Sequence, residues 1–198
     1  MPTDSQRNSI ILASASPRRA ELLAMVGQDF EVMVSHADET MCPFISVEEQ
    51  TMACAAAKAH AVAERVDDGD KRPIVACDTI VLVDREVLGK PHDADDARRM
   101  LKLLSGRSHQ VISGVCILAR GIERRFYEST DVRFRELSDA EIEDYVLSGE
   151  PLDKAGSYGI QGKASLFVQG IHGDYFNVVG LPLCHLMQEL ESLEEAGQ

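Results

Sequence analysis

The chain has 198 residues, of which 44% are hydrophobic and 27% are charged, and this length and balance suit one globular domain or a two-lobed unit. Its formal net charge of −13 argues against a nucleic-acid-binding protein, because affinity for a phosphate backbone comes from clustered Lys and Arg side chains. An acidic protein that handles a phosphorylated substrate must gather its few basic side chains locally or bring a divalent cation.

The sequence also favours a cytoplasmic protein with no membrane association. The apolar run near its start covers residues 10–13, which is too short for a signal peptide or a membrane span. The five cysteines are odd in number and contain no C-x-x-C pair, which disfavours a disulfide framework and a zinc site. We expect one folded domain over residues 8–195, with flexible ends at 1–7 and 196–198.

Strand and helix signals alternate through the first half of the chain. Ser16 and Pro17 suit the start of a helix that follows the first strand, and Ser46 with Glu49 forms a capping box for an alanine-rich helix. The hydrophobic pattern predicts strands and helices in turn. The strands cover residues 10–13, 30–34 and 74–83, and the helices cover residues 17–26, 47–65 and 93–104.

The second half predicts two strands around Gly121, a helix capped by Ser138 and Glu141, and a glycine-rich loop. The strands cover residues 111–119, 125–135 and 166–171, the loop covers 153–162, and the last helix covers 181–193. Because short turns join several adjacent strands, the sheet is mixed rather than purely parallel. We therefore predict an α/β fold with two lobes, a mixed twisted sheet flanked by helices, and a central cleft.

The segment from Ser14 to Arg19 passes from a strand into a helix, and such places bind anions. Backbone N–H groups, the Ser14 hydroxyl and the guanidinium groups of Arg18 and Arg19 could converge there on a phosphate. Two arginines in a first helical turn oppose the helix dipole, and a bound anion would remove that conflict. An ordinary Ser/Pro cap with solvated arginines is the alternative.

Asp78 interrupts the otherwise apolar run of residues 74–83. A carboxylate inside a buried strand carries a desolvation cost unless it is paired or bound to a metal, so this position suggests a general base or a metal ligand. The alternative is an aspartate that is hydrogen-bonded to the backbone at a turn between two shorter strands. Its neighbour Cys77 is disfavoured as a nucleophile, because no histidine is near in sequence.

Further candidates depend on weaker local signals. Lys90, in L-G-K-P, and Lys58, on the alanine-rich helix, could contact phosphate or could be solvated. Glu39 could supply a carboxylate for a divalent cation, with Asp38 as its competitor. The histidines have no metal-ligand spacing, which favours Mg²⁺ or Mn²⁺ over zinc. Gln161, in a glycine-rich segment, could read a base edge or be an ordinary polar loop residue.

Together these segments resemble the Maf family over residues 10–193. The resemblance rests on their order, which is S-x-S-P-R-R, D-E, a helical lysine, A-C-D-T, L-G-K-P, A-G-x-Y-x-I-Q-G and N-V-V-G-L-P-L. It implies a two-lobed fold related to the inosine triphosphate pyrophosphatases (Maf/Ham1), a divalent cation, and hydrolysis of a nucleoside triphosphate to the monophosphate and pyrophosphate. The chain departs from many relatives at Ala53-Cys54-Ala55, which lacks an accessory positive charge, and at Asp84-Arg85-Glu86, which replaces a flexible turn.

The resemblance also implies a role for each candidate. Asp78 would take a proton from the water that attacks the α-phosphorus, and it would share the cation with Glu39. The phosphate-binding residues would be Ser14, Arg18, Arg19, Lys58 and Lys90. The residues that set base choice would be Arg18, Thr79 and Gln161. Glutamine in Y-x-I-Q-G resembles the dTTP and UTP type, whereas the 7-methylguanosine triphosphate type resembles S-E-G there.

Two other functions stay open at this point. One is a nucleotide-sensing regulator of cell division and septum formation with little turnover. The presence of Asp78, the candidate general base, disfavours this function. The other is a general phosphatase, which would release inorganic phosphate rather than pyrophosphate. The family resemblance also favours a homodimer.

Overall fold

The computed structural model describes residues 9–37 and 45–196. Their strands form one mixed sheet, in which hydrogen bonds join the order β2-β1-β3-β5-β6-β7 and β4 pairs with β3. The chain divides into two compact units, which we describe separately. The first comprises Met1–Asp78, Ser113–Glu128 and Gly180–Gln198, and the second comprises Thr79–Ile112 and Ser129–Val179. The α/β class and the mixed sheet flanked by helices are confirmed, whereas the cleft stays a prediction.

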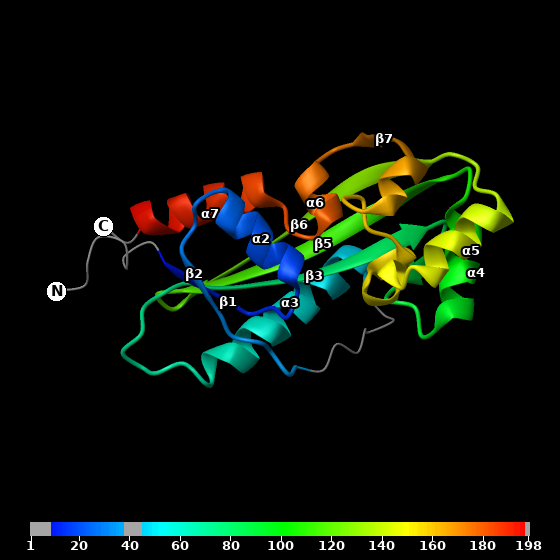
Figure 1. The fold of residues 1–198 in the computed structure, drawn as a ribbon. Helices are drawn as coiled ribbons and strands as arrows, with labels where there is room; N and C mark the ends of the chain where they lie inside the picture. The colour runs from blue at the N-terminus through cyan, green and yellow to red at the C-terminus, as the bar shows by residue number, and fades with distance from the viewer. Residues whose placement is uncertain (1–8, 38–44, 197–198) are drawn as a thin grey trace. The chain divides into compact units, whose positions relative to one another are not determined.

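The first unit is built on parallel strands. β1 pairs in parallel with both β2 and β3, with Ile11 opposite Glu31 on one side and Ile74 on the other. Helices α2 and α7 cover one face of these strands, and α3 covers the other (Figure 1). The elements are β1 (Ile10–Leu12), α2 (Pro17–Met25), β2 (Phe30–Val32), α3 (Val47–Ala63), α7 (Leu183–Glu195), and parts of β3 (Ile74–Val83), β5 (Ser108–Ala119) and β6 (Ile122–Phe134).

Small side chains allow α3 to pack closely against the sheet. Its alanines share a buried cluster with residues of β1, β3 and β5, so the helix axis can approach the strands. Gly114 on β5 shows how close the approach is, because a β-carbon there would lie 2.3 Å from the Thr51 carbonyl carbon. The cluster is Ile11, Ala13, Ala55, Ala56, Ala59, Val62, Ile74, Ala76 and Cys116.

The second unit contains antiparallel pairings. β4 returns along β3 as a hairpin, with Val81 opposite Leu88, and β7 pairs antiparallel with β6. Helices α4 and α5 lie side by side (Figure 1). The elements are β4 (Glu86–Leu88), α4 (Ala94–Leu104), α5 (Asp139–Leu147), η1 (Glu150–Asp153), η2 (Ala155–Ser157), η3 (Lys163–Phe167), β7 (Val168–His172), α6 (Tyr175–Val179), and the remaining parts of β3, β5 and β6.

Two sequence predictions about local structure need correction. Ser16 occupies the N-cap position of α2, but its side chain makes no capping bond, and its N–H donates to the Ser14 hydroxyl at 3.1 Å. The glycine-rich segment is not a plain loop, since it begins at the last residue of η1 and contains η2 and a turn, and η3 delays the following strand to Val168. By contrast, both predicted capping boxes, at Ser46 and Ser138, are formed. In the described part of the chain, every helix is too short or too polar to cross a membrane.

Candidate functional site

Asp78 lies in the middle of an unbroken strand. β3 runs from Ile74 to Val83 without an interruption at Asp78, so the alternative of a turn between two shorter strands is wrong. The strand alternates its side chains between the two faces of the sheet. Asp78 therefore points to the face covered by α3, while the thiol of Cys77 lies on the opposite face, 3.4 Å from the Gly180 carbonyl oxygen.

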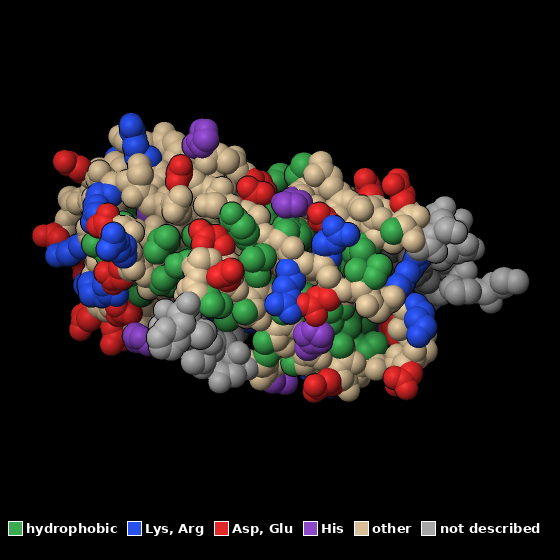
Figure 2. All heavy atoms as spheres, turned by 180° about the vertical axis from the view of Figure 1, so that it is seen from behind, with side chains coloured by type: hydrophobic (Ala, Val, Ile, Leu, Met, Phe, Trp, Pro, Cys, Tyr) green, Lys and Arg blue, Asp and Glu red, His purple; other side chains and the backbone are tan. Residues whose placement is uncertain are grey.

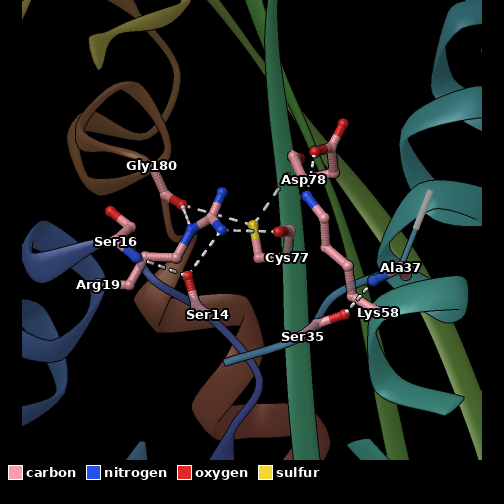
Figure 3. A network of polar contacts seen from close by, with 9 residues as sticks. All are labelled: Ser14, Ser16, Arg19, Ser35, Ala37, Lys58, Cys77, Asp78 and Gly180. Atoms are coloured by element: carbon pink, nitrogen blue, oxygen red, sulfur yellow. Dashed lines mark hydrogen bonds and ion pairs between the residues drawn. The ribbon is translucent and has the colours of Figure 1, made fainter. Parts of the chain in front are cut away.

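Lys58 supplies the partner that a carboxylate in this position needs. Its Nζ donates to Asp78 Oδ1 at 2.6 Å, and the two side chains are 10% and 13% exposed (Figure 3). Lys58 comes from α3, whose alanine-rich face brings the helix close enough for one lysine side chain to reach the strand. The ion pair offsets the cost of removing both charges from water, and the short charge-assisted bond fixes the orientation of the carboxylate. The interpretation of Lys58 as a solvated surface lysine is therefore wrong.

Arg19 ties three separate segments together beside the same strand. Its Nε donates to the Gly180 carbonyl oxygen at 2.8 Å, and its Nη1 donates to the Cys77 carbonyl oxygen at 2.7 Å and to the Ser14 hydroxyl at 3.1 Å (Figure 3). These acceptors belong to the segment that leads into α7, to β3 and to the segment that follows β1. The Arg19 side chain is consequently a fixed part of the site, and the interpretation of a solvated arginine does not hold for it.

Ser14 and Arg18 complete the phosphate candidates of this unit. Ser14 is 6% exposed, and its hydroxyl accepts hydrogen bonds from the Arg19 guanidinium and from the Ser16 N–H. Arg18 is half-buried in the first turn of α2. The first unit thus brings Ser14 and Arg19 to Cys77 and Lys58 to Asp78, so that Ser14, Arg19 and Lys58 lie beside the middle of β3 (Figure 3).

The second unit holds the remaining candidates. Thr79 follows Asp78 on β3, and Lys90 is exposed just after β4. The Gly156 N–H donates to the Gly89 carbonyl oxygen at 3.0 Å, which links the segment of Lys90 to the glycine-rich segment that carries the exposed Gln161. We predict that Thr79, Lys90 and Gln161 form one site with the candidates of the first unit, and this stays a prediction.

Of the two predicted metal ligands, Asp78 and Glu39, the structure describes only Asp78. Glu39 and its competitor Asp38 lie outside the described residues. Within residues 9–37 and 45–196, no group of three or more His, Cys, Asp and Glu side chains is placed to hold a metal ion. A single carboxylate, Asp78, fits a hard cation such as Mg²⁺ only if phosphate and water oxygens supply most of its ligands, as is usual for Mg²⁺.

Some contacts at the site could not be found from sequence. Gly180 stands in N-V-V-G-L-P-L, which drew attention as a motif but suggested no role. Its backbone has a φ of 127°, which favours glycine, and its carbonyl oxygen accepts from Arg19. Asn177 of the same motif is buried and donates to the Val111 carbonyl oxygen at 3.0 Å, so it fixes the backbone there.

The chain resembles known proteins in its sequence and in its fold. The family described as "Maf-like protein" matches residues 9–193. A curated protein of Bacillus cereus (strain B4264), named dTTP/UTP pyrophosphatase, is 50% identical over 185 residues, which cover 93% of this chain and 95% of that protein. A Bacillus anthracis protein of the same name is 51% identical over 182 residues, covering 92% and 94%. The Staphylococcus aureus Ham1 protein superposes with a TM-score of 0.52 at 15% identity, covering 93% and 98%, which supports the predicted fold.

Proposed function

The chain belongs to the Maf family, and on that basis we propose that it hydrolyses dTTP and UTP to the monophosphate and pyrophosphate. The observation that carries the proposal is the ion pair between Asp78 and Lys58, which places one oriented carboxylate on a strand beside the Arg19 contacts. The shared name of the half-identical relatives from Bacillus supports the same substrates.

Asp78 acts as the general base in this reaction. Its carboxylate takes a proton from a water molecule, and the water oxygen forms a bond to the α-phosphorus. The bond from the α-phosphorus to the oxygen that bridges to the β-phosphate breaks, and pyrophosphate leaves with that electron pair. Because Lys58 holds Oδ1 at 2.6 Å, the carboxylate keeps a constant orientation toward the attacking water.

The basic residues bind the phosphates and stabilise the charge that develops on them. Arg18, Lys58 and Lys90 supply positive charge, and Ser14 supplies a hydroxyl that Arg19 holds in place. Arg19 donates hydrogen bonds to the carbonyl oxygens of Gly180 and Cys77 and to the Ser14 hydroxyl, so it contributes to phosphate binding by holding Ser14 and the β1–α2 turn in place.

A divalent cation, Mg²⁺ or Mn²⁺, completes the proposed site, with Asp78 and Glu39 as its protein ligands. When it is bound, it neutralises phosphate charge and polarises the phosphorus. Asp78 fits this role chemically, because carboxylate oxygens are the hard donors that Mg²⁺ and Mn²⁺ prefer.

Gln161, Thr79 and Arg18 set the choice of base. Gln161 is exposed on a turn, where its amide can both donate to and accept from a pyrimidine edge.

A free nucleotide, rather than a nucleic acid, suits the surface in Figure 2, where acidic and basic side chains are interspersed. From the family resemblance we also propose a cytoplasmic location, a homodimer and a role in septum formation.

The test is a product analysis. The purified protein is incubated with Mg²⁺ or Mn²⁺ and with dTTP, UTP, CTP, GTP or 7-methyl-GTP, and pyrophosphate is resolved from inorganic phosphate. We expect pyrophosphate from dTTP and UTP, and a fall of about 10²- to 10⁴-fold in kcat for Asp78→Asn. Asp131→Asn, on an exposed position of β6, is the matched control and should keep full activity.

Each other outcome has a definite meaning. Inorganic phosphate as the first product would identify a general phosphatase. Tight nucleotide binding without turnover would identify the nucleotide-sensing regulator and would overturn the enzymatic proposal.

A further inference from the structure

Gln161 stands on a short turn with fixed ends. The Gly162 N–H donates to the Gly159 carbonyl oxygen at 3.0 Å, so residues 159–162 form a β-turn with Ile160 and Gln161 at its centre. The Ile160 side chain is 9% exposed and faces the interior, whereas Gln161 faces solvent. The turn therefore presents one amide side chain outward from a buried neighbour.

Tyr145 and Glu150 hold the two ends of this turn. The Tyr145 hydroxyl accepts from the Gly159 N–H at 3.2 Å and donates to Glu150 Oε1 at 3.0 Å. The other carboxylate oxygen, Oε2, accepts from the Lys163 N–H at 3.3 Å. One hydroxyl and one carboxylate thus connect the backbone before Gln161 to the backbone after it, and we call Tyr145 and Glu150 the turn clamp.

The turn clamp is anchored in the interior of the second unit. Tyr145 is 3% exposed on α5, and its ring packs edge-on against Phe167 with centroids 5.2 Å apart. Burial raises the pKa of Tyr145, so its hydroxyl keeps its proton and remains a donor to Glu150. One residue before the turn, the Tyr158 hydroxyl lies 2.8 Å from Nε2 of buried His109, which fixes the entry to the turn as well.

The glycine at the end of the turn is required by the clamp. A β-carbon on Gly162 would lie 2.0 Å from Glu150 Oε1 and 2.6 Å from its carboxyl carbon. The carboxylate therefore occupies the space that a side chain at position 162 would need. Because Glu150 has a flexible side chain, a methyl group there would displace the carboxylate rather than the backbone.

We propose that Tyr145 and Glu150 are positioning residues for base recognition, because they fix the turn from which Gln161 reads the nucleotide base. The inference rests on the proposed function, in which Gln161 contacts the base. A side chain on a fixed turn loses less conformational freedom when it binds, so discrimination between bases depends on the clamp even though neither clamp residue touches the substrate.

The test compares base discrimination in single and double variants. Tyr145→Phe removes the bridging hydroxyl and keeps the ring, and Gly162→Ala displaces Glu150 from the other side. In each variant, we expect KM for dTTP to rise and kcat to stay within about twofold of the wild-type value. The ratio of kcat/KM for dTTP to kcat/KM for CTP should fall about tenfold, which corresponds to the loss of one or two hydrogen bonds. Tyr127→Phe removes a hydroxyl from a side chain that is 47% exposed and is the matched control.

Glu150→Gln gives a graded comparison. Both carboxylate oxygens accept hydrogen bonds, whereas a glutamine has one acceptor oxygen, so this variant can keep one of the two contacts. We expect the dTTP/CTP ratio of kcat/KM for Glu150→Gln to lie between the ratios of the wild-type protein and Tyr145→Phe. Hydrogen exchange supplies a readout without turnover, and it should become faster at the amides of Gly159 and Lys163 in Tyr145→Phe.

A double-variant cycle separates positioning from general stability. In a Gln161→Ala background, Tyr145→Phe should change the dTTP/CTP ratio no further, because the side chain that the clamp positions is gone. An equal loss in both backgrounds, or an unchanged ratio in Tyr145→Phe while the wild-type protein is active, would overturn the inference alone. If the wild-type protein hydrolyses neither nucleotide, the proposed function fails and the inference falls with it.

Discussion

Replacing Lys58 by methionine tests how much the ion pair with Asp78 contributes to stability. Methionine has a similar length and no charge, so Lys58→Met leaves the Asp78 carboxylate in a largely buried position without its cation. The Nζ–Oδ1 distance is 2.6 Å, and the two side chains retain only 10% and 13% of their exposure. The substitution therefore separates the charge from the packing of the side chain.

The magnitude follows from burial and distance. At an effective dielectric constant of about 20, two unit charges 2.6 Å apart attract by about 6 kcal/mol, and the desolvation of both groups offsets much of this. Removing one partner of a buried pair costs about 3 to 5 kcal/mol, and some remaining exposure places this site near the lower value. We expect Lys58→Met to lower the free energy of unfolding by about 3 kcal/mol and Tm by about 6 to 12 °C.

Urea unfolding at pH 7 measures this change, with two comparisons. Lys102 pairs with Asp139 at 2.8 Å, but the side chains are 58% and 85% exposed, so Lys102→Met should cost less than about 1 kcal/mol. The double variant Lys58→Met/Asp78→Asn should be more stable than Lys58→Met, because it removes the isolated charge. Equal effects of Lys58→Met and Lys102→Met would refute the reasoning.

Two further predictions concern buried positions. Burial lowers the pKa of His109 from 6.5 to about 4. Between these two pH values the unfolded chain binds a proton that the folded chain does not. The contribution of His109 to the free energy of unfolding is therefore full above about pH 6.5 and falls by up to about 3 kcal/mol as the pH drops to 4. Urea unfolding across this range should show a shallower decline in His109→Gln, and parallel profiles would contradict the prediction. Gly114→Ala places a β-carbon 2.3 Å from the backbone of Thr51, so it should lower Tm by more than about 6 °C, whereas Gly69→Ala, with open space, should not.

Local features of the fold could be predicted because their chemistry lies within a few residues. Both capping boxes join a serine to a glutamate three positions later, so the sequence contains the whole interaction. The strand at residues 74–83 was predicted with its exact bounds from its apolar run. The short strand Glu86–Leu88 was not predicted, since three residues carry too little periodicity and its pairing with β3 supplies the signal.

Contacts between distant segments could not be predicted in the same way. Asp78 drew attention as a charge in an apolar strand, but its partner Lys58 lies 20 positions away on a helix whose lysine could equally face solvent. Tyr145 and Glu150 had no sequence signal at all. Their importance comes from hydrogen bonds to the backbone N–H groups of Gly159 and Lys163, and backbone donors are present at almost every position of a chain.

Arg19 shows how a sound local argument can lead to an incomplete conclusion. Its positive charge at the start of α2 opposes the helix dipole, and a bound anion would resolve that conflict. Protein groups resolve part of this conflict, because the carbonyl oxygens of Gly180 and Cys77, each with partial negative charge, accept from the guanidinium at 2.8 and 2.7 Å. The presence of Arg19 is therefore no independent evidence for phosphate. Since Cys77 directly precedes Asp78, the same contacts instead fix the strand position from which the catalytic carboxylate is proposed to act.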